Sequence, residues 1–265
     1  MRFVPTLATI DGVKISAVII AFNEEENIAK AVESVSWADE VVVVDSESTD
    51  RTRDIAEGLG ARVLIRKWTG FSDQKQFAVD QAANDWIFSL DADERVSPEL
   101  KDEILRLDLE QADGFRIPRL SFYMGRAIRH SGWYPDRQLR FFNRTKGRWK
   151  KVHIHESVEM KSGTRLSQLE NDIHHFSVNN ASHHHRMIGE RYAPLAAEQM
   201  FENGKRTSSF KIAIAGPAAF FRAYFLKLGF MDGLPGFSIA SFAAHHAFLK
   251  HLLLWEKQTR KNRPN

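Results

Sequence analysis

The chain has 265 residues, of which 43% are hydrophobic and 27% charged, and its formal net charge is +3. These values are typical of a globular protein with one sizeable domain, or with a domain and an appendage. The chain has no cysteine, which excludes disulfides, thiolate nucleophiles and zinc–thiolate sites and fits a reducing compartment. No nucleic-acid-binding motif or dense basic stripe is present, so we expect no nucleic-acid partner.

The sequence predicts neither a signal peptide nor a membrane-spanning helix. The N-terminal residues carry Arg2 and are interrupted by Pro5 and Asp11, which is not the pattern of a signal peptide. No apolar run approaches the roughly 20 residues that span a bilayer, because the best one, residues 212–221, ends at Arg222. We therefore expect a cytoplasmic protein.

The first hundred residues alternate between strand and helix patterns. Asn23 stands where it can cap the first helix, and Ser97 precedes Pro98 as the cap of the fourth. Strands separated by helices imply right-handed crossovers and a mostly parallel α/β sheet flanked by helices. The predicted strands are residues 15–20, 41–44, 62–66 and 86–90, and the second and third helices begin near residues 48 and 73.

The pattern changes after residue 113. Short β-like stretches at residues 114–117, 138–142 and 152–160 alternate with loops rich in Arg, Trp and His. After about residue 178 the pattern is helical again and ends in an apolar, weakly basic tail.

Acidic and polar residues follow three of the predicted strands. Asp91, Asp93 and Glu94 come after the buried-looking strand at residues 86–90, and the carboxyl ends of parallel strands are where such sheets bind ligands. Two carboxylates spaced i, i+2 can hold a hard divalent cation, which would neutralise a diphosphate; the alternative is a solvated acidic turn. Lys75 is a candidate phosphate ligand or a surface lysine. No dinucleotide-binding or P-loop glycine motif is present.

Several motifs together resemble a known family. AFNEEENI, VVVVDSESTDRT, FSDQKQFA and DWIFSLDADERV, in that order, look like the nucleotide-diphosphosugar domain of family 2 inverting glycosyltransferases. GWYPDRQLRFFNR followed by VHIHESVE is similar to the bacterial branch that contains lipopolysaccharide core β-1,4-glucosyltransferases. The resemblance covers roughly residues 14–176 and, more loosely, the tail.

The resemblance implies a GT-A-like fold and a site for a UDP-sugar. Residues 1–176 would form the catalytic domain, with a nucleotide-binding half at 14–110 and an acceptor half at 111–176, and residues 177–265 a helical extension. Asp45 would accept a hydrogen bond from the uracil imide, and Lys75 would contact the diphosphate. Asp91 and Asp93 match the D-x-D pair that positions the ribose, Mg²⁺ or Mn²⁺, and the β-phosphate. The uridine pocket would be lined by Phe22, Asn23 and Glu24.

Inversion requires a general base that deprotonates the acceptor hydroxyl. Two carboxylates are candidates: Glu156, preferred because its His-Glu pair resembles the family, and Asp136 as the alternative. Arg137 and Arg140 either hold a phosphate of donor or acceptor or form structural ion pairs. The Q-x-x-R-W motif of processive members is not matched, which favours transfer of a single sugar.

Histidines and aromatic residues offer further candidates. By resemblance, His174 or His175 would complete a metal shell, whereas consecutive residues 183–185 cannot easily face one ion and are expected to be solvated or paired. Trp133 and Tyr134, with Trp149, would form a platform for stacking sugar rings or belong to the core.

The tail has an apolar stripe at Phe221, Tyr224, Phe225 and Leu228, a predicted break at residues 233–236 and then an almost wholly apolar segment. An element that lies in the membrane interface and is attracted by anionic lipid explains this composition. The alternative is a helical hairpin that packs on the catalytic domain or forms a dimer contact.

The sequence thus predicts a metal-dependent hexosyltransferase on the inner face of the cell membrane, moving one sugar, glucose, from a UDP-sugar to a lipopolysaccharide-core or other lipid-linked acceptor. Alternatives are a peptide or capsular-glycan acceptor, a nucleotidyltransferase, or a non-catalytic sugar-nucleotide-binding protein.

Overall fold

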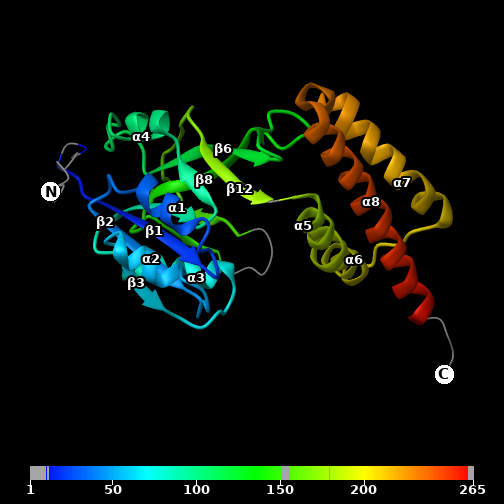
Figure 1. The fold of residues 1–265 in the computed structure, drawn as a ribbon, viewed down its shortest axis with the longest axis horizontal. Coiled ribbons are helices and arrows are strands. Elements are labelled where there is room, and N and C mark those ends of the chain that lie inside the picture. Colours follow the sequence, from blue (N-terminus) through cyan, green and yellow to red (C-terminus); the bar gives the residue numbers. More distant parts are fainter. Residues whose placement is uncertain (1–9, 11, 151–155, 179, 262–265) are drawn as a thin grey trace. The chain divides into compact units, whose positions relative to one another are not determined.

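The computed structural model describes residue 10 and residues 12–150, 156–178 and 180–261, and it divides the chain into two compact units (Figure 1). Unit 1 comprises Met1–Arg119 and Asp136–His175, and unit 2 comprises Leu120–Pro135 and Phe176–Asn265. The last junction falls between His175 and Phe176. The segment Leu120–Pro135 also belongs to unit 2, because Tyr123 and Ile128 pack with Ile239 there.

Unit 1 is built on a large mixed sheet. Its order is β3-β2-β1-β4-β8-β6-β12-β5, in which β3, β2, β1 and β4 are parallel and β8 pairs antiparallel with both β4 and β6. The predicted α/β class is confirmed. The main strands are β1 Ile15–Ala21, β2 Glu40–Asp45, β3 Arg62–Ile65, β4 Trp86–Asp91, β5 Glu94–Val96, β6 Gly114–Tyr123, β8 Asp136–Asn143 and β12 Ile173–Val178; β7 Arg126–Ala127 and β11 Leu166–Gln168 pair with β6.

Helices cover both faces of the parallel part of the sheet. All seven residues of β1 are buried, and its side chains alternate between two hydrophobic clusters, with Ile19 in one and Val18 in the other. Such double burial is typical of a parallel sheet. The first cluster includes residues of α1 Ile28–Ser34, α2 Thr52–Gly58 and α4 Pro98–Ile104, and the second includes residues of α3 Phe71–Gln81.

Local predictions in this half have mixed outcomes. Ser97 caps α4 as predicted, since its Oγ accepts a hydrogen bond from the Leu100 amide at 3.1 Å. The predicted cap at Asn23 is wrong, because α1 begins only at Ile28. Asn23 instead has a positive φ of 52°, and its Oδ1 accepts from the Thr49 amide at 2.9 Å. Tertiary contacts between two loops have overridden a local capping pattern.

The predicted strand at residues 152–160 is described only in part. Residues 152–155 lie outside the described residues, and β10 Val158–Met160 pairs antiparallel with β9 Gly147–Trp149, with Val158 opposite Trp149. The strand predicted at residues 114–117 is longer than expected, since β6 continues to Tyr123.

Unit 2 is mainly helical. Its helical segments are α5 Ala181–Arg186, η1 Met187–Tyr192, α6 Ala193–Glu202, α7 Ser209–Phe221, η2 Arg222–Leu226, η3 Gly229–Asp232 and α8 Gly233–Lys261. Helices α7 and α8 approach closely where Gly216 faces Ala244, because a Cβ on Gly216 would lie 3.3 Å from the Ala244 carbonyl oxygen. Small residues permit this distance between backbones.

The break predicted at residues 233–236 is displaced. The chain turns at Leu228, which has a φ of 54°, and at the short helix η3, and α8 starts at Gly233. Among the described helices, none is long and apolar enough alone to cross a membrane; Ser209–Leu226 and Gly229–Thr259 satisfy length and composition only as a pair bent by 71°.

Candidate functional site

The loops after β1 and β2 in unit 1 are joined by hydrogen bonds. The Asn23 amide donates to Ser48 Oγ at 2.8 Å, and the Glu24 amide donates to Thr52 Oγ1 at 2.8 Å. These bonds join the segments that follow β1 and β2, which are parallel neighbours, at the edge of the sheet where such folds bind ligands. Phe22, at the start of this loop, has an exposed fraction of 56%. A large aromatic ring left in solvent beside buried strands is a candidate surface for stacking a base.

Asp45 ends β2 and is completely buried. Its Oδ1 accepts a hydrogen bond from the Ser48 amide at 2.9 Å and lies 3.8 Å from Arg53 Nε. Within the described part of the chain, its Oδ2 has no hydrogen-bond partner. Buried polar atoms are normally paired, so this oxygen is a candidate acceptor for a donor group of a ligand.

Glu24 lies in a strongly acidic environment. Burial raises the pKa of its carboxyl, and the negative charges of Asp93 and Asp50 raise it further, while a hydrogen bond from Asn27 at 2.8 Å opposes them. The loop after β1 and the turn after β4 therefore share one electrostatic environment. Residues predicted to bind the nucleotide and the metal are brought near each other by the sheet.

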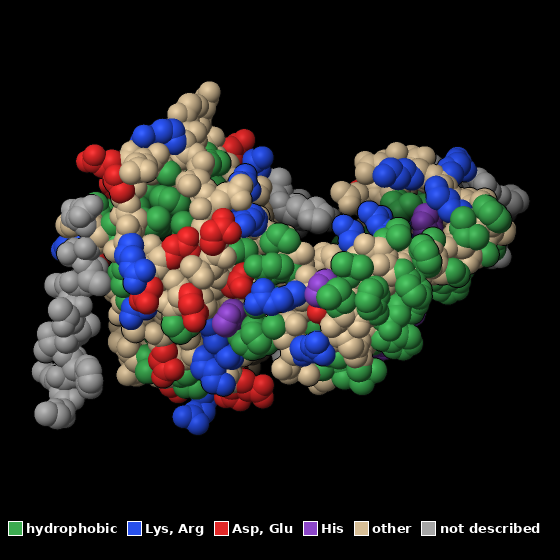
Figure 2. All heavy atoms as spheres, turned by 90° about the horizontal axis from the view of Figure 1, so that it is seen from above, with side chains coloured by type: hydrophobic (Ala, Val, Ile, Leu, Met, Phe, Trp, Pro, Cys, Tyr) green, Lys and Arg blue, Asp and Glu red, His purple; other side chains and the backbone are tan. Residues whose placement is uncertain are grey.

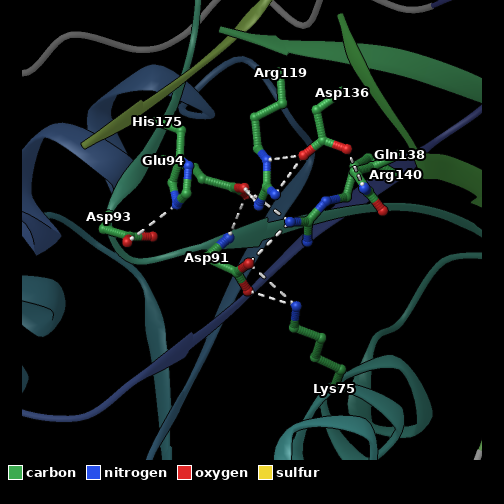
Figure 3. A network of polar contacts seen from close by, with 9 residues as sticks. All are labelled: Lys75, Asp91, Asp93, Glu94, Arg119, Asp136, Gln138, Arg140 and His175. Atoms are coloured by element: carbon green, nitrogen blue, oxygen red, sulfur yellow. Dashed lines mark hydrogen bonds and ion pairs between the residues drawn. The ribbon is translucent and has the colours of Figure 1, made fainter. Parts of the chain in front are cut away.

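Asp91, the last residue of β4, is held by two buried cations (Figure 3). Lys75 Nζ lies 2.8 Å from Asp91 Oδ1, and Arg140 Nη2 lies 2.8 Å from Asp91 Oδ2. The side chain of Lys75 is 5% exposed and that of Arg140 4%, so neither is a surface ion pair. Lys75 belongs to α3, and its Nζ also lies 4.9 Å from the centre of the Trp149 ring on β9.

Asp91 and Arg140 shift each other's pKa values. Burial alone would raise the pKa of Asp91, but Arg140 and Lys75 together hold it well below its usual value. Burial likewise opposes the charge on Arg140, whose pKa is nevertheless raised by Asp91 and Glu94. Asp91 and Arg140 are therefore both charged at neutral pH, and a phosphate or a metal ion entering here would meet these fixed charges.

Glu94, already expected at this strand end, and Arg119, which was not predicted, complete the network. Glu94 Oε1 is completely buried and lies 2.8 Å from Arg140 Nη2 and 3.1 Å from Arg119 Nη1. Arg119 also donates to Asp136 Oδ2, from Nε at 3.0 Å and from Nη2 at 2.5 Å. Its two hydrogen bonds to Asp136 join β6 to the start of β8. Arg119 stands between Pro118 and Leu120 on β6, which also carries Arg116, so its place in the sequence does not mark it as a site residue.

The two carboxylates of the D-x-D pair contact different partners. Asp93 lies in the turn between β4 and β5, and its Oδ2 is 3.4 Å from His175 Nε2 on β12. No group of three or more His, Asp or Glu side chains is arranged to hold a metal within the described ranges. Magnesium is usually bound by one or two carboxylates together with water and substrate phosphates. Asp93 fits the carboxylate of such a set, which a nucleotide would complete, and His175 adds a ring nitrogen beside it.

The two candidate bases are placed differently. Asp136 begins β8, is 36% exposed, and is fixed by Arg119 on Oδ2 and by Gln138, which donates to Oδ1 at 2.7 Å. It therefore belongs to the same network as Asp91 (Figure 3). Glu156 is half-buried and directly follows residues 151–155, outside the described residues. His153 and His155 of the predicted His-Glu motif fall in that gap.

The remaining predicted residues have structural partners. Arg137 donates from Nη1 to the Leu169 carbonyl oxygen at 2.6 Å, and its Nη2 lies 3.5 Å from Glu170. In unit 2, the Trp133 ring packs 6.0 Å from the rings of both Tyr123 and His184, and Tyr134 lies 5.4 Å from the Arg129 guanidinium. Burial, with a smaller effect of the neighbouring His183, lowers the pKa of His184 to about 4.

Taken together, unit 1 offers a buried carboxylate for a donor group, paired cations at the carboxyl edge of the sheet, and a carboxylate–histidine pair beside them. Such a set can bind a nucleoside diphosphate with a divalent cation and stabilise negative charge on a leaving phosphate.

The chain is similar to known glycosyltransferases. Residues 16–171 match the model of glycosyl transferase family 2. The lipopolysaccharide core biosynthesis glycosyltransferase LpsC of Rhizobium meliloti (strain 1021) is 32% identical over 260 residues, which cover 95% of each chain. An uncharacterized glycosyltransferase of Rickettsia felis is 34% identical over 251 residues, covering 89% of this chain and 88% of that protein.

Two solved structures are also similar. Residues 1–349 of TarS from S. aureus superpose with a TM-score of 0.45 at 16% identity, covering 95% of this chain and 92% of that one. Glucosyl-3-phosphoglycerate synthase of Mycobacterium tuberculosis, solved with Mn²⁺, UDP-glucose and glycerol 3-phosphate, gives a TM-score of 0.36 at 27% identity, covering 48% and 51%. On the family match and the full-length similarity to LpsC, the chain belongs to glycosyltransferase family 2 and has the GT-A-like fold of that family.

Proposed function

We propose that this glycosyltransferase moves one sugar, glucose, from a UDP-sugar to a lipopolysaccharide-core or other lipid-linked glycan, with inversion, at the inner face of the cell membrane. The observation that carries the donor site is the convergence of buried Lys75 and Arg140 on Asp91 at the end of β4. A buried cation pair at the carboxyl edge of an α/β sheet suits a diphosphate. The acceptor class is supported by the similarity to LpsC along the whole chain.

Asp45 is our candidate for recognition of the base. A carboxylate accepts hydrogen bonds but donates none, and uracil presents an imide N–H where cytosine presents an acceptor. The Asp45 Oδ2 atom, which has no partner among the described residues, would therefore accept from uracil and disfavour cytosine. Because the side chain is completely covered, the loop after β2 must open slightly to admit the base.

Asp93 and His175 are the proposed protein ligands of Mg²⁺ or Mn²⁺. When bound, the ion would neutralise the diphosphate as it leaves. Lys75 would support the same phosphates from the other side of Asp91, and Arg140 would keep Asp91 ionised and oriented. These roles follow from the contacts of each side chain: Asp93 reaches His175 at 3.4 Å, whereas Asp91 is already neutralised by two cations.

Asp136 is our preferred general base, and Glu156 remains the alternative. Asp136 is supported by its position in the network and by its partial exposure, which allows an acceptor hydroxyl to approach. Arg119 would act as a positioning residue, since it fixes one carboxylate oxygen and is itself fixed by Glu94. General base catalysis typically contributes about 10²–10⁴-fold to a rate.

Calorimetric titration with UDP, with and without Mn²⁺, tests the donor site. We expect metal-dependent binding that Asp93→Ala abolishes and that exposed Asp54→Asn, the matched control, leaves unchanged. We also expect UDP to bind more tightly than CDP, and Asp45→Asn to reduce this preference. Absence of UDP binding to the folded wild-type protein under any metal condition would contradict the proposal.

Transfer assays identify the base and the products. Purified lipopolysaccharide core is offered with UDP-glucose and other UDP-sugars, and the linkage is read by NMR. We expect Asp136→Asn to keep its affinity for UDP but lose sugar transfer, and Glu156→Gln to retain sugar transfer. The reverse result would assign the base to Glu156, and a retained anomeric configuration in the product would refute inversion.

A further inference from the structure

The turn between α7 and α8 in unit 2 exposes an unusual number of large apolar side chains. We call the following six residues the apolar tip: Phe221, Phe225, Leu226, Phe230, Met231 and Leu234. Each of them has an exposed fraction between 48% and 67%. Figure 2 shows hydrophobic side chains gathered over this helical region, with Lys and Arg among them. Exposed apolar groups of this size mark interaction surfaces.

The apolar tip is supported by tight packing beneath it. The Tyr224 ring lies 5.2 Å from the Phe225 ring and 6.2 Å from the Phe230 ring. A Cβ on Gly236 would lie 1.9 Å from the Gly229 carbonyl oxygen, so the first turn of α8 sits directly against η3. The exposed side chains are thus held on a preformed turn and need little ordering when they bind.

The α7–α8 hairpin is basic. From Gly204 to Trp255 the sequence has six Lys or Arg residues and a single acidic residue, Asp232, and two of the six basic residues, Arg222 and Lys227, belong to the turn that carries the apolar tip. Asp232 is buried, and its carboxylate already has partners: it accepts a hydrogen bond from the His130 amide at 2.9 Å and lies 3.0 Å from His130 Nδ1. Arg222 and Lys227 are exposed beside the tip, and Arg126 donates to the Met231 carbonyl oxygen at 3.2 Å.

We propose that the apolar tip inserts into the interface of an anionic phospholipid bilayer, while Arg222, Lys227 and Arg126 bind the headgroups. Aromatic and aliphatic side chains flanked by cations are the composition of interfacial membrane elements. A second copy of the chain is a poorer partner, because a symmetric contact would bring Arg222 and Lys227 against their own counterparts. This proposal rests on the proposed function in one respect: a lipid-linked acceptor would bring the enzyme to a membrane.

Cosedimentation of the full chain with vesicles tests this proposal without nucleotide or sugar. We expect binding to phosphatidylglycerol vesicles and much weaker binding to phosphatidylcholine vesicles. Leu226→Glu should lower the vesicle partition coefficient about tenfold, since the bilayer would then lose the apolar contact of one inserted leucine side chain. Arg222→Gln and Lys227→Gln should each lower it about fivefold at low salt, and added salt should remove that difference.

Leu59→Glu, in unit 1, is the matched control, because Leu59 is an apolar residue with an exposed fraction of 43% outside the apolar tip. It should bind vesicles as the wild type does, and circular dichroism checks that every variant is folded. No binding of the wild type to phosphatidylglycerol, or equal effects of Leu226→Glu and Leu59→Glu, would overturn the proposal. A dimer in light scattering that Leu226→Glu dissociates, without vesicle binding, would assign the tip to self-association. UDP titration of the same samples reports separately on the proposed function.

Discussion

Replacing Arg140 with methionine removes the cation that Asp91 and Glu94 share. Arg140 is 4% exposed, and its Nη2 lies 2.8 Å from both carboxylates. Removing one partner of a buried ion pair typically costs about 3–5 kcal/mol, because the other charge is left uncompensated. Lys75 still contacts Asp91 and Arg119 still contacts Glu94, so we expect a loss near the lower limit, about 3 kcal/mol.

Urea unfolding measures this loss as a shift of the midpoint at constant slope. For a protein of this size, about 3 kcal/mol corresponds to a decrease of roughly 6–12 °C in the melting temperature. Arg137→Met is the matched control on the same strand. Arg137 pairs at 3.5 Å with Glu170, whose side chain is 78% exposed, and donates one hydrogen bond to the Leu169 carbonyl oxygen. An exposed pair contributes about 1 kcal/mol or less and one hydrogen bond about 1 kcal/mol, so Arg137→Met should cost less than Arg140→Met. Equal effects of the two substitutions would refute the reasoning.

The pH dependence provides an independent check. Because Arg140 and Lys75 lower the pKa of Asp91 against the effect of burial, Asp91 stabilises the fold at any pH above its unfolded pKa of about 3.9. That contribution is lost as the pH falls through the lower, folded pKa. In Arg140→Met the pKa of Asp91 returns toward its ordinary value. The stability difference between wild type and variant should therefore be constant near neutral pH and shrink below about pH 4. A difference that grows on acidification would contradict this.

Three further substitutions test single contacts. Ser97→Ala should cost about 1 kcal/mol in urea unfolding, since it removes the cap of α4; no change would mean that the cap is redundant. Gly236→Ala should destabilise the protein by about 1–3 kcal/mol, because the new methyl group would meet the Gly229 carbonyl oxygen, whereas a Cβ at Gly189 meets nothing within 4 Å and Gly189→Ala should be tolerated. Lys75→Met should weaken UDP binding at least severalfold in calorimetry while the fold is retained, since it removes a cation from the proposed phosphate site; unchanged affinity would exclude this role.

Sequence patterns predicted the parallel half of the fold well because its determinants are local. The strand at residues 86–90 reads as an apolar run bounded by polar residues, and the structure has β4 at Trp86–Asp91. Ser97 followed by Pro98 is a cap that acts within one helical turn. In both cases the residues that decide the structure lie beside each other in the chain, so periodicity and capping rules suffice.

Residues whose role depends on distant partners escaped these rules. Arg119 contacts Glu94 and Asp136, which are 25 and 17 residues away, and nothing in its own neighbourhood indicates either contact. Asn23 fits the pattern of a helix cap, yet its side chain bonds to Thr49, 26 residues away. The order of strands in the sheet decides which residues meet, and a single sequence does not specify that order for the antiparallel half.

The D-x-D pair shows how the fold assigns different tasks to similar residues. Spacing alone suggests that Asp91 and Asp93 act together on one cation. In the structure Asp91 ends a strand and faces Lys75 and Arg140, whereas Asp93 lies in the following turn and faces His175. A carboxylate already neutralised by two buried cations has little charge left to attract a metal ion. We therefore expect Asp93 to contribute most of the metal affinity, and Asp91 chiefly to hold Lys75 and Arg140 where a diphosphate can reach them.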